Sequence, residues 1–173
     1  MTAGRESISR TKDWCTPPEY VEAVRRVLGG TIHLDPCSNE HSLVRAEVEI
    51  SPPDDGLAEP WRYPTVYVNP PYGRDKARGT TIRDWLGKCG EAHAAGSDVL
   101  ALVPVATNTR HWREHVFTAT GICFLKVPRL KFMLGGSAGG KGAPMACAMV
   151  YWGCGFDRFR EVFCDFGTVF RCP

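Results

Sequence analysis

The sequence predicts an α/β fold built on a mostly parallel sheet with an antiparallel hairpin at its edge. Three observations carry this prediction. Apolar runs of strand length alternate with segments of helical periodicity, which is typical of a doubly wound sheet. Residues 99–104 are apolar throughout, as expected for a central strand that is buried on both faces. Two further apolar runs, 121–127 and 145–152, close the pattern as a pair of strands.

The first expected helix follows a polar lead-in, residues 1–12, which we expect to be flexible. Thr16 with Glu19 three positions later has the pattern of a capping box, and Pro17 suits the first turn of a helix. Apolar residues then recur at helical spacing until the Gly29–Gly30 pair, which is expected to end the helix.

The remaining elements follow from the same periodicities. The expected strands are 31–34, 46–50, 65–68, 99–104, 121–127 and 145–152, the expected helices are 82–95 and 109–118, and the Gly-rich stretch 135–142 is expected to be a mobile loop. Only about 30 residues lie between Asp35 and Asn69, which is roughly what one strand–helix–strand unit needs. We therefore expect the sheet to lack one strand and its helix on that side.

Length and composition indicate one domain, residues 1–173, of an ordinary soluble protein. Hydrophobic residues make up 43% of the chain and charged residues 23%. No apolar run approaches the ~18 residues of a membrane span, so no membrane association is expected. Eight cysteines without a Cys-x-x-Cys pair, and no signal-peptide pattern, favour free thiols and a cytoplasmic location.

The most informative motif is Asn69-Pro70-Pro71-Tyr72, directly after the expected strand 65–68. The side-chain carbonyl of Asn69 and the backbone carbonyl of Pro70 can accept the two N–H bonds of an aromatic amine, and the prolines hold that backbone rigidly. Two acceptors favour the positive charge that develops on the nitrogen as it attacks a methyl donor. The ring of Tyr72 can stack on the base. A rigid strand-to-loop turn is the structural alternative for the same four residues.

A second polar motif, Asp35-Pro36-Cys37-Ser38, follows the expected strand 31–34. In open α/β sheets, ligands bind beyond the carboxyl ends of the strands. If the two strands are neighbours, both motifs face one crevice, with the cofactor at the first motif and the substrate at the second.

Beyond these motifs, the chain resembles the phage-type, Dam-like DNA N-6-adenine-methyltransferases over residues 14–132. In chain order, the resemblance is carried by Trp14-Cys-Thr-Pro17, Leu34-Asp-Pro-Cys-Ser-Asn39, Asp54-Asp-Gly-Leu57 with Trp61, Val68-Asn-Pro-Pro-Tyr-Gly73, Trp85, Leu102-Val-Pro104 with Thr107 and Thr109, and Arg129-Leu-Lys-Phe132. It implies a shortened Rossmann-like methyltransferase fold and S-adenosylmethionine as cofactor. It also implies double-stranded DNA as partner, with the target adenine flipped out of the duplex, and the cytoplasm of a bacterial host if the protein is encoded by a phage.

The resemblance also assigns roles to individual residues. The catalytic residues are Asn69, Pro70, Pro71 and Tyr72, and the cofactor-binding residues are Trp14, Thr16, Pro17, Asp35, Pro36, Ser38, Asn39 and Asp55, with Asp54 as the rival of Asp55 for the adenosine. Ser38 and Asn39 stand where the family pattern usually has Gly-x-Gly. The expected DNA-binding residues come from two basic clusters and are Arg74, Lys76, Arg129, Lys131 and Phe132.

Other functions fit parts of the same pattern. Asn-Pro-Pro-Tyr also suits methylation of cytosine N4 in DNA, of guanine in RNA or of glutamine in proteins, and a DNA-binding module without catalysis is a further alternative. His111 and His115 fit a His-x-x-Glu-His zinc motif, but no third ligand is apparent, so no metal is expected. The sequence predicts neither the target DNA sequence nor the oligomeric state.

Overall fold

The structure is a computed structural model that describes residues 14–127, 130–135, 137–138 and 145–173. The expected flexible segment 1–12 lies outside the described residues, and so does most of the expected mobile loop 135–142. No described helix is long and apolar enough to cross a membrane.

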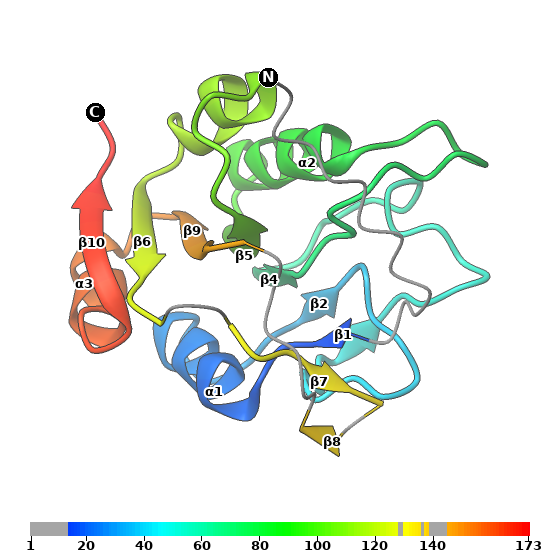
Figure 1. Cartoon of the computed structure of the whole chain (residues 1–173), viewed down its shortest axis with the longest axis horizontal. Coiled ribbons are helices and arrows are strands. Elements are labelled where there is room, and N and C mark those ends of the chain that lie inside the picture. The colour runs from blue at the N-terminus through cyan, green and yellow to red at the C-terminus, as the bar shows by residue number, and fades with distance from the viewer. Residues whose placement is uncertain (1–13, 128–129, 136, 139–144) are drawn as a thin grey trace.

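A seven-stranded sheet with the order β10-β6-β9-β5-β4-β2-β3 forms the centre of the molecule (Figure 1). Its strands are β2 (Leu34–Asp35), β3 (Val48–Glu49), β4 (Thr65–Val68), β5 (Asp98–Pro104), β6 (Gly121–Leu125), β9 (Cys147–Trp152) and β10 (Gly167–Arg171). β3, β2, β4 and β5 are mutually parallel, β9 is antiparallel to both β5 and β6, and β10 is antiparallel to β6. The fold is thus mixed α/β, with the expected parallel part and the expected antiparallel β6–β9 pair, and β10 is an edge strand that the sequence did not predict.

Helices cover both faces of the sheet. α1 (Pro18–Val27) and α3 (Phe156–Phe163) pack on one face, and α2 (Ile82–Ala94) and the short η1 (Trp112–Val116) pack on the other. β5 shows the alternation that this requires, because Leu100 and Leu102 join the first core cluster while Val99, Ala101 and Val103 join the second. All five side chains are fully buried, as the unbroken apolar run predicted.

The start of α1 differs from the expected capping box, so that prediction is wrong. The N-cap residue is Pro17, the helix begins at Pro18, and no side chain caps it. The Thr16 hydroxyl instead makes a 2.7 Å hydrogen bond with the hydroxyl of Tyr67 in β4. A capping box does precede α2, where the Asp84 carboxylate accepts from both the N–H and the hydroxyl of Thr81.

Beyond β2 the sheet continues with β3 alone, and the helix that was expected to be missing on this side is absent. β2 and β3 have two residues each, and no helix lies anywhere between β2 and β4, a stretch that the structure describes completely. The half-buried alternation expected for 46–50 is not observed, because both residues of β3 are exposed and Val48 is 36% accessible.

The helix expected at 109–118 is reduced to η1, a single π-helical turn. The Phe117 N–H bonds to the Trp112 carbonyl five residues earlier, at 3.0 Å. Trp112 is fully buried, donates its indole N–H to the Pro104 carbonyl at 3.0 Å and stacks on Phe124. Within the described part of the chain, no three His, Cys, Asp or Glu side chains are grouped so that they could hold a metal.

A second, three-stranded sheet was not expected. It consists of β1 (Trp14–Cys15), β7 (Met133–Leu134) and β8 (Ser137–Ala138), all antiparallel, and lies beside β2 (Figure 1). β8 falls within the Gly-rich stretch that was predicted to be a mobile loop. The pairing of β1 with β7 brings the start of the described chain beside the segment that contains Lys131 and Phe132.

Candidate active site

The two strand-end motifs meet at one pocket. β2 and β4 are adjacent and parallel, with Leu34 opposite Val66, so the segments that follow Asp35 and Val68 leave the sheet side by side. The pocket is lined by Trp14, Cys15, Thr16, Asp35, Cys37, Ser38, Asn39, Ser42, Leu43, Val44 and Asn69. Six of these were predicted from the sequence: Trp14, Thr16, Asp35, Ser38, Asn39 and Asn69. A second hollow, between α1 and α3, contains none of the predicted residues.

Asp35 places a carboxyl group inside this pocket. Its side chain is 4% exposed, and its Oδ1 accepts the Cys37 N–H at 3.1 Å. Burial raises the pKa of Asp35 to about 7, a rise that the charge of Glu49 adds to and the hydrogen bond from Cys37 opposes. No cation pairs with Asp35 among the described residues. A buried carboxyl without a cation is suited to a cationic or hydroxyl-bearing ligand.

Ser38 adds a second polar group that the fold does not satisfy. Its N–H bonds to the Ile50 carbonyl at 2.9 Å, which fixes the loop against β3. Its hydroxyl is buried and has no hydrogen-bond partner of normal geometry among the described residues, although its proximity to Asp35 slightly lowers the pKa of that carboxyl. Leaving a buried hydroxyl unpaired costs ~1–3 kcal/mol, so the site favours a ligand that bonds to it.

The next turn of the loop closes the pocket. The side-chain carbonyl of Asn39 accepts the His41 N–H at 2.9 Å and the Cys15 thiol at 3.5 Å, so it holds the turn and the neighbouring strand β1 together. Ser42, Leu43 and Val44 follow and line the pocket. These three have no motif and no periodicity in the sequence, and for that reason they were not predicted.

Thr16 is held in the pocket wall by a hydrogen bond to the sheet. It is 2% exposed, and its hydroxyl bonds to that of Tyr67, which is fully buried in the sheet. Burial strongly raises the pKa of Tyr67, so its hydroxyl stays neutral and available for this bond. Pro17 and Pro36, both predicted to bind the cofactor, are buried beside the pocket residues and do not line the pocket.

The Asn69–Tyr72 segment lies at the same edge of the sheet. Asn69 is partly buried and lines the pocket, Pro70 is buried, and Pro71 is exposed. The Tyr72 hydroxyl donates to the Leu102 carbonyl of β5 at 3.4 Å, and burial keeps the pKa of Tyr72 well above its ordinary value. The tyrosine is therefore neutral, and its ring is anchored at its far end.

An aromatic row joins Trp14 in the pocket wall to the Asn69–Tyr72 segment. The ring of Phe132 is 6.2 Å from the ring of Tyr72 and 6.2 Å from that of Trp14, with both pairs edge-on. Phe132 is only 5% exposed, so it packs between two site aromatics, whereas its neighbour Lys131 is exposed. Arg129, the other residue predicted to bind DNA in this segment, lies outside the described residues.

Asp55 is held by other parts of the protein and does not line the pocket. Its Oδ1 accepts the Leu57 N–H at 3.0 Å, and its Oδ2 is 3.2 Å from Nε of Arg78. The neighbouring Gly56 packs so tightly on the loop after β2 that a Cβ there would lie 1.7 Å from the Pro36 carbonyl oxygen. Asp54, the rival candidate, is exposed. Gly56 thus lets its loop pack closely against the loop that follows Asp35.

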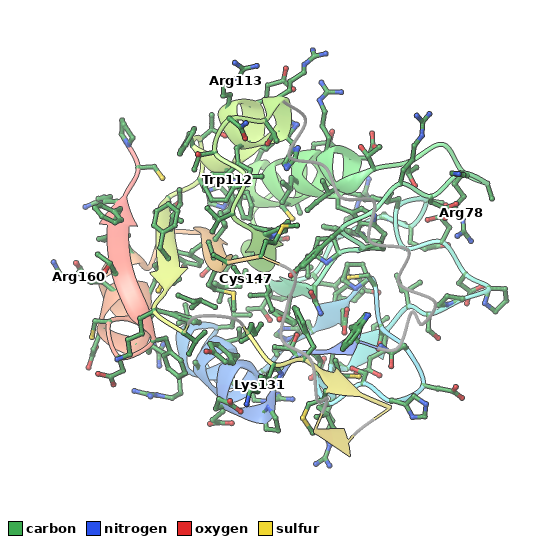
Figure 2. The ribbon with its side chains drawn as sticks, in the orientation of Figure 1. Arg78, Trp112, Arg113, Lys131, Cys147 and Arg160 are labelled. Carbon is green, nitrogen blue, oxygen red and sulfur yellow. The ribbon has the colours of Figure 1, made fainter. Side chains whose placement is uncertain are left out.

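The loop after Tyr72 presents basic side chains. Arg74 and Lys76 are exposed, and between them Asp75 accepts the backbone N–H of Ala77 at 2.9 Å and that of Arg78 at 3.2 Å. Arg78 forms ion pairs with both Asp75 and Asp55. Figure 2 shows Arg78 among the loops that follow β3 and β4. This leaves Arg74 and Lys76 as cations on a loop that Asp75 and Arg78 hold in place.

Comparison with known proteins gives one match. The model of the family described as DNA N-6-adenine-methyltransferase (Dam) matches residues 6–166. No curated protein and no solved structure matches the chain significantly. The matched range includes β2, β4, the pocket between them and the whole Asn69–Tyr72 segment.

Proposed function

Because the chain belongs to the DNA N-6-adenine-methyltransferase (Dam) family, we propose that it transfers a methyl group from S-adenosylmethionine to N6 of adenine in double-stranded DNA. Family membership itself indicates a DNA methyltransferase that acts on adenine N6. The observation that carries the finer proposal is the shared pocket, which Asp35 and Ser38 line together with Asn69.

The chemistry of the polar groups that line the pocket supports S-adenosylmethionine as the cofactor. The cofactor carries an ammonium group and two ribose hydroxyls. The pocket offers the carboxyl of Asp35, which has no cationic partner among the described residues, and the buried hydroxyl of Ser38. Trp14 and Thr16 supply an aromatic and a hydroxyl-bearing wall. When bound, the cofactor supplies an electrophilic methyl group on a sulfonium. Asp55 is not needed for this proposal, because its carboxylate is paired with Arg78; a contact of Asp55 with the adenosine stays a prediction.

The Asn69–Tyr72 segment is proposed to hold the target adenine. The base must leave the duplex stack to reach the pocket. The Asn69 side-chain carbonyl and the Pro70 backbone carbonyl accept the two N–H bonds of the adenine amine and stabilise the positive charge that develops as the nitrogen attacks. Tyr72, anchored on the Leu102 carbonyl, offers its ring for stacking. Alignment of the amine with the methyl group supplies the rest of the acceleration, and no strong general base is required.

DNA is proposed to approach over Arg74, Lys76 and Lys131, which are exposed cations in segments that flank Tyr72 and Phe132. Contacts by Arg129 and Phe132 stay predictions. Phe132 would act from within the aromatic row, since it is buried against Trp14 and Tyr72.

The test is transfer of a labelled methyl group from S-adenosylmethionine to unmethylated duplex DNA, followed by nucleoside analysis. N6-methyladenine is the expected product. N4-methylcytosine would keep the chemistry and change the base, and cofactor binding without labelled DNA would direct the search to RNA or protein substrates. Absence of both cofactor binding and transfer would contradict the proposal.

Asn69→Ala supplies the matched catalytic variant. Loss of an acceptor that acts mainly on the developing charge is expected to lower the rate at saturating cofactor by about 10²–10³-fold. The circular dichroism spectrum and the melting temperature should stay close to those of the native chain. A near-normal rate with cofactor in excess would remove Asn69 from the proposed mechanism.

A further inference from the structure

β10 forms one border of the seven-stranded sheet, and within the described ranges it pairs with β6 alone. Figure 1 shows it at the left edge of the molecule, with α3 behind it. It offers five residues of extended backbone, whereas β3 at the opposite border has two. A border of this length is a template for pairing with another strand.

Two hydrogen bonds show which backbone groups of β10 face outward. The Phe166 carbonyl accepts an N–H from the β6 side at 3.0 Å, and the Cys172 N–H donates to a carbonyl of that side at 3.2 Å. Since backbone groups in an antiparallel strand alternate between its two sides, even-numbered residues face β6 and odd-numbered residues face away. Gly167, Val169 and Arg171 therefore present three N–H donors and three carbonyl acceptors at the border.

We propose that β10 pairs antiparallel with β10 of a second copy of the chain, about a twofold axis at Val169. In this register Val169 faces Val169 of the second copy, and Gly167 faces Arg171 of the second copy. Every outward-facing residue then opposes another outward-facing residue, so that all six donors and all six acceptors of the two strands pair. The strand is thus complementary to itself, as a twofold interface requires.

The side chains of β10 support the same partner. Phe170 is 54% exposed, although its ring packs edge-on against Phe124 at 5.9 Å. In the proposed register, Thr168 opposes Phe170 of the second copy, and the two Phe170 rings become diagonal neighbours within reach of each other. Pairing would therefore cover an aromatic ring that the single chain leaves in water.

The border also lacks the features that prevent such pairing. Residues 167–171 contain no Pro and no Lys, the residues that natural proteins place on free edges. The single charged side chain, Arg171, lies over the ring of Phe156 at 5.0 Å. No like charges are brought together at the twofold axis, because Arg171 opposes Gly167 there.

The proposed dimer leaves both active sites open. The pocket lies between the ends of β2 and β4, and three strands, β5, β9 and β6, separate β4 from β10. Pairing of five residues buries less area than the ~1,200 Å² of standard stable interfaces, so we expect a concentration-dependent dimer. The dimer and the methyl transfer are thus separable by experiment.

Sedimentation velocity over about 1 to 200 μM protein tests the proposal. The native chain is expected to pass from monomer to dimer in this range. Val169→Pro removes an outward N–H for which the described residues offer no acceptor, so it should keep the melting temperature and raise the dimer dissociation constant at least about tenfold. Val48→Lys on β3 is the control at the other border and should dimerise as the native chain does.

Three outcomes would overturn the proposal. One is a native chain that stays monomeric over the whole concentration range, which is the result expected if another segment covers the β10 edge. Another is a Val169→Pro variant that dimerises like the native chain. The third outcome concerns the position of the twofold axis. In the proposed register the two Cα atoms of residue 169 would be ~5.5 Å apart, so the Val169→Cys variant should form a disulfide between the two copies under mild oxidation. A dimer that shows no such cross-link in peptide mapping would have a different register. Val48→Cys is the control.

Discussion

At the scale of the residue, the site depends on buried polar groups whose partners come from outside the local sequence. Thr16 was predicted in the pocket by resemblance, yet its partner Tyr67 lies far along the chain, where the sequence shows only an apolar strand. Asp35 and Ser38 were predicted because they follow a strand. That Ser38 would be unsatisfied and Asp35 unpaired depends on packing, which the sequence does not show.

Asp35→Asn should change the pH dependence of stability. Burial raises the pKa of Asp35 from 3.8 to about 7, so the folded state favours its protonated form. This contribution to stability is fully present below about pH 4 and is lost as the pH rises through 7. At pH 8 and without cofactor, we therefore expect the free energy of unfolding of Asp35→Asn to be ~1–4 kcal/mol larger than that of the native chain. We expect the variant to bind S-adenosylmethionine at least about tenfold more weakly.

Urea unfolding from pH 4 to pH 8 checks the sign. The control is Asp84→Asn, because the Thr81 N–H lowers the pKa of Asp84 and that variant should be less stable than the native chain at neutral pH. A difference in stability between the native chain and Asp35→Asn that stays constant from pH 4 to pH 8, or an Asp35→Asn variant that is less stable than the native chain at pH 8, would show that the carboxyl is not buried as described.

At the scale of the element, regular helices and strands were predictable and irregular ones were not. The unbroken apolar run of β5 and the Gly29–Gly30 end of α1 match expectation because each depends on local sequence. The two-residue strands β1, β7 and β8 have no periodicity, since they are defined by pairing with distant segments. The same holds for β10, whose partner β6 fixes its position.

Gly56→Ala tests the close packing of the Gly56 loop against the loop that follows β2. A methyl group at Gly56 would meet the Pro36 carbonyl oxygen at 1.7 Å, so the loop after β2 must shift. We expect a loss of ~1–3 kcal/mol in the free energy of unfolding and weaker cofactor binding, because Asp35 precedes Pro36. Gly90→Ala is the control, since nothing lies within 4 Å of a Cβ there and alanine favours α2 by ~0.5–1 kcal/mol.

Thermal melts and a cofactor titration of both variants separate the outcomes. Equal melting temperatures for the two alanine variants would mean that the loop after β2 can shift without loss of stability. Normal cofactor affinity in a destabilised Gly56→Ala variant would show that the position of this loop does not affect cofactor binding.

At the scale of the whole molecule, the balance of charge matters for DNA. The net charge is only +2, so the proposed attraction to DNA relies on local groups, and Arg74, Lys76 and Lys131 are the candidates. This could be predicted from the sequence only as two basic clusters. The fold adds that Arg78, in the first cluster, is taken up by Asp55 and Asp75 and is not available to phosphate in the same way.

DNA affinity should therefore fall with salt, and by different amounts in different variants. Each phosphate contact that is removed lowers the slope of log K against log salt by about one. Arg74→Ala with Lys76→Ala should lower the slope by about two, while Arg62→Ala, an exposed cation outside both clusters, should leave it unchanged. Fluorescence anisotropy on a short duplex measures the slope, and equal slopes for both variants would exclude this loop from the interface.

The small sheet of β1, β7 and β8 lies between the pocket proposed for the methyl donor and the surface proposed for DNA. Trp14 and Cys15 belong to the wall of the pocket, and β7 follows directly after Lys131 and Phe132 on the side proposed for DNA. A shift of either strand would change its backbone pairing with the other. If the methyl donor fills the pocket and DNA approaches over Lys131, as proposed, we expect the two binding events to be linked through this pairing. Such linkage is reciprocal: whatever factor the donor adds to the affinity for DNA, DNA adds to the affinity for the donor.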